Sequence, residues 1–177
     1  MKIDNMSLFG ESEKPIGLAS DHAGWEAKQF IIAMLDEKAI PYIDFGTYSE
    51  ESTDYPDFAH KLGKAVSEDE CYPGIAICGS GNGINMSVNK HQKVRAALCW
   101  NKEIAKLARQ HNDANILSLP GRFLEEEEIY EILVTFLNTP FEGGRHQRRI
   151  EKIPFNNDKW LIGGAEGIAA RARIEHY

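Results

Sequence analysis

Short apolar runs alternate along the chain with longer segments in which apolar residues recur at helical spacing. The short runs predict five strands, at Ile16–Ala19, Pro41–Phe45, Gly74–Cys78, Val94–Trp100 and Asn115–Leu119. The spaced segments predict helices at Trp25–Lys38, Asp57–Ser67, Ile84–Lys90, Asn101–His111 and Glu125–Leu137. Strand–helix units in series favour an α/β fold: a three-layer, Rossmann-like parallel five-stranded sheet with helices on both faces.

The residues that directly follow the strands are the first candidates for a site, because ligands of parallel sheets bind at the carboxyl ends of the strands. These segments are rich in polar, titratable and glycine residues: Ser20-Asp21-His22, Gly46-Thr47-Tyr48, Cys78–Gly83, Trp100-Asn101 and Pro120-Gly121-Arg122. From position alone, Tyr48 and Trp100 either line a pocket or pack in the core.

The third strand delivers a cysteine to a turn with three glycines. Cys78 ends the apolar run, and Gly79-Ser80-Gly81-Asn82-Gly83 follows it. Such a turn exposes its N–H groups, and at the start of a helix these groups favour a thiolate and an oxyanion. The pattern is equally consistent with a proton-abstraction site beside a carbonyl and with a structural turn next to a buried cysteine. It misses the dinucleotide fingerprint, which requires glycine at the position of Ile84, so no nicotinamide cofactor is expected.

Composition argues against several classes of function. The chain has 177 residues, enough for one domain, and its net charge of −7 argues against non-specific binding to nucleic acid or anionic membranes. Its longest wholly apolar run, Phe30–Leu35, is much shorter than the about 18 residues of a membrane helix, and Met1–Gly10 lacks a signal-peptide pattern. The three cysteines lack the spacing of a zinc site or a disulfide framework. We therefore expect a cytoplasmic protein without a bound metal.

Two further groups of residues lie outside the strand ends. His111 closes the fourth predicted helix, where an imidazole can simply complement the helix dipole. Arg145, Arg148 and Arg149 cluster with His146 in an otherwise acidic chain. This cluster is either a solvated charged face or a phosphate site, which the paired N–H donors of arginine suit.

Taken together, five motifs resemble the ribose-5-phosphate isomerase B family, which also includes the galactose-6-phosphate isomerase subunits. They occur in order between about Ile16 and Ile153: Ser20-Asp21-His22-Ala23-Gly24, Asp54-Tyr55-Pro56, Cys78–Gly83, His111–Asn115 and Gly144-Arg145-His146. We assign residues 1–153 to a single isomerase domain with an N-terminal extension at 1–14. Residues 154–177 form a C-terminal tail outside the family pattern.

The resemblance implies a role for each matching residue. Cys78 would be the base that moves a proton between C1 and C2 of the open-chain sugar phosphate, because Ile84 stands where part of the family has a glutamate. Ser80 would assist near the reacting carbons, and Asp21 with His111 would open the furanose ring. The other implied contacts are an anion hole and sugar site made by Gly79, Gly81, Asn82, Gly83, Asn112 and Tyr48, and phosphate ligands His22, Arg122, Arg145, His146 and Arg149.

The implied activity is that of an aldose–ketose isomerase. It would interconvert D-ribose 5-phosphate and D-ribulose 5-phosphate, in the pentose phosphate pathway, through ring opening and an enediolate. This chemistry requires a base, an anion hole and an acid/base for ring opening, but no cofactor. The implied assembly is a homodimer, or a tetramer, with active sites shared between subunits.

Two alternatives remain open. One is a six-carbon substrate, galactose 6-phosphate or allose 6-phosphate, which would use the same chemistry. The other is a non-catalytic protein that binds phosphorylated metabolites. The presence of both Cys78 and His111 favours an enzyme, because binding phosphate requires neither residue.

Overall fold

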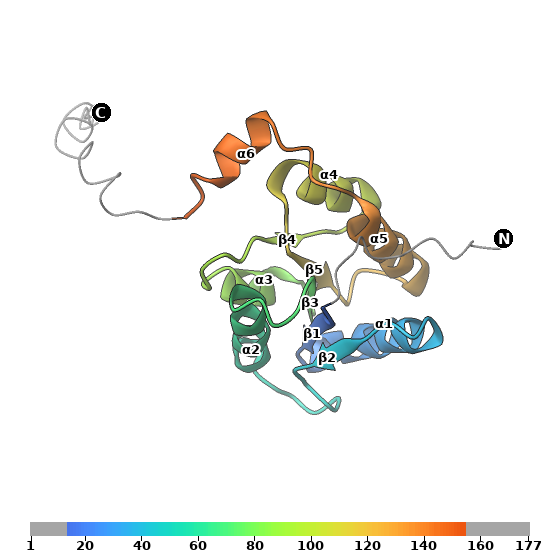
Figure 1. Ribbon diagram of the computed structural model, residues 1–177. Helices are drawn as coiled ribbons and strands as arrows, with labels where there is room; N and C mark the ends of the chain where they lie inside the picture. Colours follow the sequence, from blue (N-terminus) through green and yellow to red (C-terminus); the bar gives the residue numbers. More distant parts are fainter. Residues whose placement is uncertain (1–13, 155–177) are drawn as a thin grey trace, which may run out of the picture.

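The computed structural model describes residues 14–154 (Figure 1). Residues 1–13 and 155–177, which include most of the expected N-terminal extension and C-terminal tail, lie outside the described residues. None of the helices between residues 14 and 154 combines the length and the apolar character that a bilayer crossing demands.

Five parallel strands form the centre of the fold, in the order β2-β1-β3-β5-β4. They are β1 (Ile16–Ser20), β2 (Tyr42–Asp44), β3 (Gly74–Cys78), β4 (Ala96–Leu98) and β5 (Ile116–Pro120). The three central strands are buried along their whole length, as parallel strands covered on both faces should be. The edge strands β2 and β4 are shorter than predicted, because each pairs with a neighbour on one side only.

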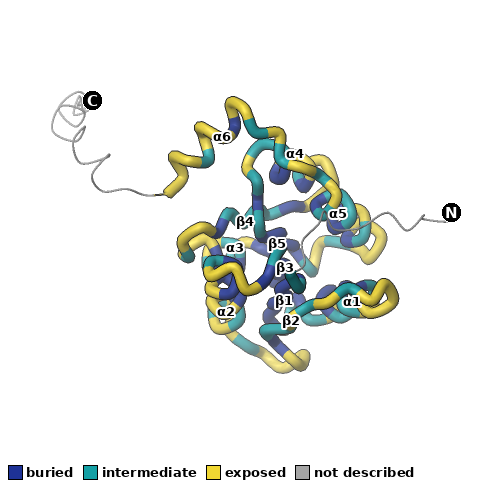
Figure 2. Tube along the Cα trace, viewed as in Figure 1, coloured by how far each residue is buried: buried dark blue, intermediate teal, exposed yellow. Residues whose placement is uncertain are grey.

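Helices cover both faces of this sheet (Figures 1 and 2). On one face α1 (Trp25–Glu37), α4 (Lys102–Asn112) and α5 (Glu126–Asn138) bury a core that includes Ile31 and Phe136. On the other face α2 (Tyr55–Ser67) and α3 (Asn82–Val88) bury a second core, with Leu62 and Ile84. The predicted three-layer α/β fold is therefore confirmed.

Three details differ from the predicted elements. The helix α3 begins at Asn82, two residues earlier than predicted, so Asn82 and Gly83 belong to its first turn. A short 3-10 helix, η1 (His22–Gly24), follows β1. A helix that the apolar pattern did not predict, α6 (Arg145–Ile150), packs against α4 and projects away from the sheet (Figure 1).

The strand order determines where the site forms. From β1 the chain moves outward to β2 and then returns to β3 on the other side of β1. The carboxyl ends of β1 and β3 therefore form a topological switch point, where ligands of open α/β sheets bind.

Candidate active site

The turn after β1 lies directly beside the end of β3. The N–H of Asp21 donates to the carbonyl of Ile77 at 3.2 Å. A methyl group on Gly24 would lie 2.6 Å from the same carbonyl oxygen, so η1 presses on β3 where only glycine fits. The Asp21 carboxylate accepts a 3.0 Å hydrogen bond from the Gly24 N–H. Buried Asp21 is thus held next to the end of β3.

His22 follows in the same turn, and its tautomer is fixed. Its Nδ1 accepts a 3.2 Å hydrogen bond from the N–H of Thr53. The neutral ring therefore carries its proton on Nε2, which makes that nitrogen a donor. A donor at this edge of the sheet suits an anionic group of a ligand.

Cys78 differs from the other two cysteines in its position. It ends β3 and is 4% exposed, at the switch point. Burial raises the pKa of both Cys71 and Cys99 to about 12, so these two thiols stay protonated near neutral pH. Of the three cysteines, Cys78 is therefore the one that lies at the switch point.

The turn between β3 and α3 requires its glycines. Gly81 has a left-handed backbone, with φ 73°, and a methyl group there would lie 2.4 Å from the Leu98 Cδ1. A methyl group on Gly83 would lie 2.5 Å from the ring of Tyr55. The Ser80 side chain is exposed, and its Oγ accepts a 3.4 Å hydrogen bond from the N–H of Asn82. The turn is therefore held closely between β4, β5 and the start of α2.

Arg122 brings a permanent positive charge to this edge. Its N–H donates to the carbonyl of Gly79 at 3.1 Å. Its side chain lies over that glycine, because a methyl group on Gly79 would lie 3.3 Å from Arg122 Cδ and 3.4 Å from Nε. We call Asp21, His22, Cys78, Arg122 and the intervening turn Gly79–Gly83 the carboxyl-edge cluster.

The loop after β2 is organised by a buried lysine. Lys28 is 0% exposed, and its Nζ lies 2.6 Å from Asp44 Oδ1 and donates to the Thr47 carbonyl. Desolvation lowers the pKa of Lys28, although the Asp44 carboxylate opposes that shift. Tyr48 is 71% exposed, and its hydroxyl donates to the Asp44 carbonyl at 3.0 Å. Tyr48 therefore does not pack in the core, and neither does Trp100, which is 55% exposed.

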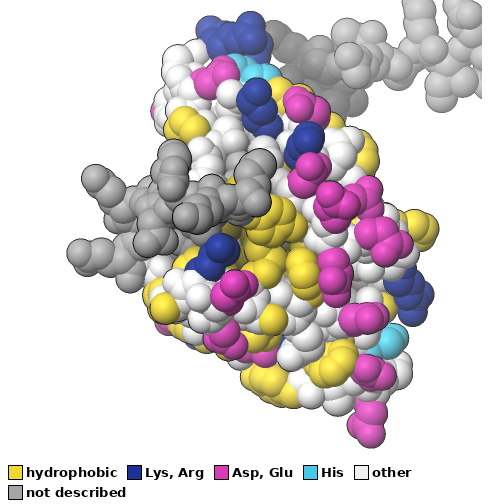
Figure 3. Space-filling view, turned by 90° about the vertical axis from the view of Figure 1, so that its right-hand side faces the viewer, with side chains coloured by type: hydrophobic (Ala, Val, Ile, Leu, Met, Phe, Trp, Pro, Cys, Tyr) yellow, Lys and Arg dark blue, Asp and Glu magenta, His cyan; other side chains and the backbone are white. Residues whose placement is uncertain are grey.

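A second group of the expected site residues gathers where α4 ends and α6 begins. The rings of His111 and His146 stack, with centroids 4.2 Å apart and planes 6° apart. The Glu142 Oε2 lies 3.9 Å from the His111 Nε2 and 3.6 Å from the His146 Nε2. Desolvation, the neighbouring His111 and Arg145 lower the pKa of His146, against the effect of Glu142. Figure 3 shows Lys or Arg, His and acidic side chains together at this end of the molecule.

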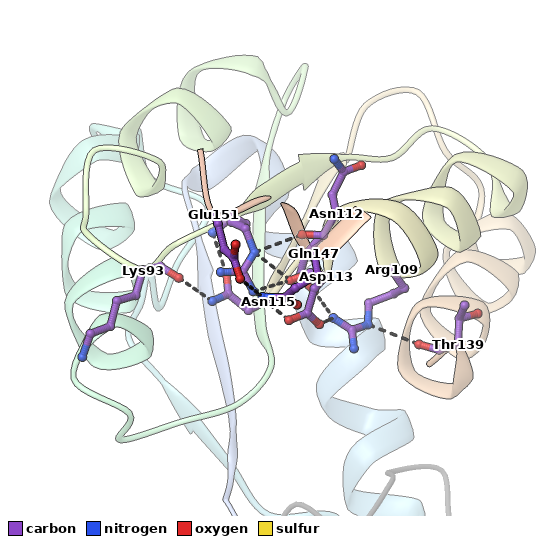
Figure 4. Close-up of polar contacts among 10 residues, drawn as sticks. Lys93, Arg109, Asn112, Asp113, Asn115, Thr139, Gln147 and Glu151 are labelled. Carbon is purple, nitrogen blue, oxygen red and sulfur yellow. Dashed lines mark hydrogen bonds and ion pairs between the residues drawn. The ribbon is translucent and has the colours of Figure 1, made fainter. Parts of the chain in front are cut away.

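A network of ion pairs fixes the end of α4 (Figure 4). Asp113 follows the helix in a left-handed conformation, with φ 44°. Its two carboxylate oxygens accept 2.8 Å hydrogen bonds, one from Arg109 and one from Arg95. The Arg95 Nε also donates to the Asn112 carbonyl at 3.0 Å. This network anchors the turn that carries His111 and Asn112 to the start of β4.

The two groups lie at opposite edges of the sheet. The helix α4 leaves the carboxyl end of β4 and returns to the start of β5, so its last residues lie at the amino edge. The expected pair of Asp21 and His111 is therefore not formed within one chain. We call the second group the amino-edge cluster; it comprises His111, Asn112, Glu142, Arg145, His146 and Arg149.

Three residues near these clusters received no role from the sequence. Glu142 contacts both histidines, Tyr55 packs on Gly83, and Lys28 holds the loop that carries Tyr48. Tyr55 belongs to the motif Asp54-Tyr55-Pro56 quoted above, and this motif could have marked it as a residue near the site. Lys28 gave no such signal, because its partners Asp44 and Thr47 are distant in the sequence, and neither did Glu142, whose partner His111 lies on another helix.

Comparison with known proteins gives consistent matches. A model of the family described as Ribose/Galactose Isomerase matches residues 16–153. A protein of Escherichia coli (strain K12) named ribose-5-phosphate isomerase B is 42% identical over 140 residues, which are 79% of this chain and 94% of that protein.

Solved structures agree with these matches. A ribose 5-phosphate isomerase from Thermotoga maritima is 48% identical, with a TM-score of 0.78, and the match covers 80% of this chain and 98% of the other. Ribose-5-phosphate isomerase B from Mycoplasma genitalium, solved with bound ribulose-5-phosphate, is 43% identical, with a TM-score of 0.76. That match covers 81% of this chain and 95% of the other.

Proposed function

Because the chain belongs to the ribose/galactose isomerase family, we propose that it interconverts D-ribose 5-phosphate and D-ribulose 5-phosphate, a reaction of the pentose phosphate pathway. One observation carries this proposal. The switch point holds a cysteine, a carboxylate, a histidine donor and an arginine around a glycine turn, all at one edge of the sheet. The relative solved with ribulose-5-phosphate supports a five-carbon sugar phosphate as the ligand.

The proton transfer would centre on Cys78. Its thiolate takes the proton from C2 of the open-chain aldose, and the electron pair moves into the C1–C2 bond while negative charge develops on O1. The resulting enediolate is stabilised by N–H groups of Gly79, Gly81 and Gly83 and by Asn82. The thiol then returns the proton to C1, and the hydroxyl of Ser80 assists the proton shift between O1 and O2. No electrons leave the substrate, so the reaction needs no external oxidant.

The phosphate would bind at the same edge and orient the sugar. His22 offers an Nε2 proton, and Arg122 offers paired N–H donors beside Gly79. The phosphate does not react, so its binding energy serves to position C1 and C2 against Cys78. Tyr48, exposed at the neighbouring strand end, would contact the sugar.

A second copy of the chain would complete the site. One chain holds its two clusters at opposite edges, and α6 projects away from the body of the fold (Figure 1). In a homodimer, or a tetramer built from such dimers, the amino-edge cluster of one copy would meet the carboxyl-edge cluster of the other. His111 would then act on ring opening together with Asp21 of the other copy, Asn112 would bind the sugar, and Arg145, His146 and Arg149 would bind the phosphate.

A six-carbon sugar phosphate is the second candidate, because the matching family is described by galactose as well as ribose. A coupled assay with ribose 5-phosphate, galactose 6-phosphate and allose 6-phosphate separates the two. We expect turnover of ribose 5-phosphate that falls by several orders of magnitude in Cys78→Ala and remains in the matched control Cys99→Ala. Full turnover in Cys78→Ala would remove that residue from the mechanism, and saturable binding without turnover of any of the sugars would indicate a binding protein.

Mixing two inactive variants tests the shared site. When Cys78→Ala is exchanged with His111→Ala, half of the dimers are mixed and each has one intact site, so about a quarter of the wild-type activity should return. The control mixture pairs Cys78→Ala with Asp21→Ala. Both changes lie in the carboxyl-edge cluster, so mixing should restore nothing. Equal results for the two mixtures, after verified exchange, would contradict sharing.

A further inference from the structure

The amino-edge cluster brings three donor atoms together, and one of them, on Glu142, has no part in the proposed catalytic role. One ligand atom each of His111, Glu142 and His146 lies within 4.8 Å of the other two. Two imidazole nitrogens and one carboxylate oxygen are the donors that zinc and other divalent transition metals prefer. The sequence gave no hint of the complete set, because 30 residues lie between His111 and Glu142.

A backbone hydrogen bond holds Glu142 in place, and packing holds His146. The Glu142 N–H donates to the Gln110 carbonyl at 3.0 Å, which ties this acidic residue to the last turn of α4. The His146 side chain is 6% exposed, so its position is fixed by packing. The His111 side chain is 36% exposed, and within residues 14–154 its one ion-pairing partner is Glu142. One side of the cluster is thus fixed, and the other can adjust.

We propose that His111, Glu142 and His146 bind one divalent transition-metal ion, such as Zn²⁺ or Ni²⁺, and that this ion inhibits the isomerase. The inhibition rests on the proposed function, because the ion would occupy the two imidazoles assigned to ring opening and phosphate binding. The binding itself rests only on the geometry of this chain.

Binding requires two local changes. The nitrogen lone pairs of the two stacked rings lie in nearly parallel planes, with the ring centroids 4.2 Å apart, so the His111 ring must turn before both nitrogens can lie about 2.0–2.1 Å from one ion. Arg145 must also withdraw, because its Nε donates to the His146 Nε2 at 3.4 Å and so occupies the nitrogen that the metal needs. Arg145 therefore opposes the metal through its charge and through this contact.

Removal of the Arg145 side chain should therefore change the affinities for the two ligands in opposite directions. Arg145→Ala should weaken the binding of a sugar phosphate but tighten the binding of a metal ion. Glu142→Gln removes the ligand charge at a half-exposed position and should weaken metal binding by at least about tenfold, the lower end of the loss seen when even an outer-shell partner is removed.

The experiment titrates Ni²⁺ into metal-free full-length protein, with heat and Ni²⁺ absorption spectra as readouts that need no activity. The control His60→Asn disrupts the other pair of imidazoles, in which the His60 Nδ1 lies 3.0 Å from the His91 Nε2. Cys78→Ala excludes the thiol as a ligand. We expect one ion per chain in wild type, His60→Asn and Cys78→Ala, weaker binding in Glu142→Gln, and tighter binding in Arg145→Ala.

Two results would overturn the proposal: no stoichiometric binding by the wild type, or wild-type affinity in Glu142→Gln. Inhibition is measured separately. Ni²⁺ should inhibit isomerisation in competition with ribose 5-phosphate, and a chelator should reverse it. Binding without inhibition of an active enzyme would contradict the inhibitory role. An enzyme inactive on every sugar phosphate but still binding Ni²⁺ would refute the proposed function and leave the metal site standing.

Discussion

Gly81→Ala probes the turn on which the proposed anion hole depends. Gly81 has φ 73°, a conformation that costs an L-amino acid about 1–2 kcal/mol. The added methyl group would lie 2.4 Å from Leu98 Cδ1 and 3.0 Å from the backbone carbonyl carbon of Leu119. Inserting a methyl group into such a contact costs about 1–3 kcal/mol more. The free energy of unfolding should therefore fall by about 2–5 kcal/mol.

The same change should reduce catalysis beyond its effect on stability. Relief of the clash moves the turn, and a misplacement of about 1 Å at a reacting centre costs about 100-fold in rate. Urea unfolding gives the stability, and kcat/KM measured far below the unfolding midpoint gives the activity. Gly143→Ala is the matched control. Gly143 also has a left-handed backbone, with φ 67°, but a methyl group added there would have no neighbouring atom within 4 Å.

The double variant Gly81→Ala/Leu98→Ala separates the two contributions. Removing the Leu98 side chain makes room for the methyl group, so most of the steric part should disappear while the backbone part remains. If Gly81→Ala lost no more stability than Gly143→Ala and kept full activity, the assignment of a tight, positioned turn would be refuted.

Three further predictions concern other titratable groups. Lys28→Met should cost about 3–5 kcal/mol in urea unfolding, because it removes a fully buried cation and leaves the partly buried Asp44 carboxylate without its ion-pair partner; a loss below about 1 kcal/mol would contradict this. Desolvation and the neighbouring His60 lower the pKa of His91. Near pH 6.5 and just below it, the unfolded chain therefore binds more protons than the folded chain does. Stability should therefore decrease as the pH falls from 7.5 to 5.5, and His91→Gln should flatten that slope in urea titrations. At pH 8, mass spectrometry should find Cys71 and Cys99 alkylated more slowly by iodoacetamide than Cys78, which ends β3, and the opposite order would contradict the choice of Cys78 as the candidate base.

Local pattern predicted most of the fold correctly. The order of strands and helices follows from short continuous apolar runs and from apolar residues spaced at the helical period of 3.6, both of which short segments carry by themselves. The position of Cys78 at a strand end, followed by glycines, was also visible. The pattern did not predict α6, since Arg145–Ile150 has little apolar content and is held by packing of His146.

The sequence by itself determined most of the elements and the glycine turn after β3, and it named the candidate residues of the site, because each of these depends on neighbours along the chain. Only the tertiary structure decided the strand order, and with it the meeting of Asp21 and Cys78 at one edge. It also separated His111 from that edge and placed Glu142 beside two histidines. These arrangements depend on which helix packs on which face of the sheet, and no local pattern of residues encodes that choice.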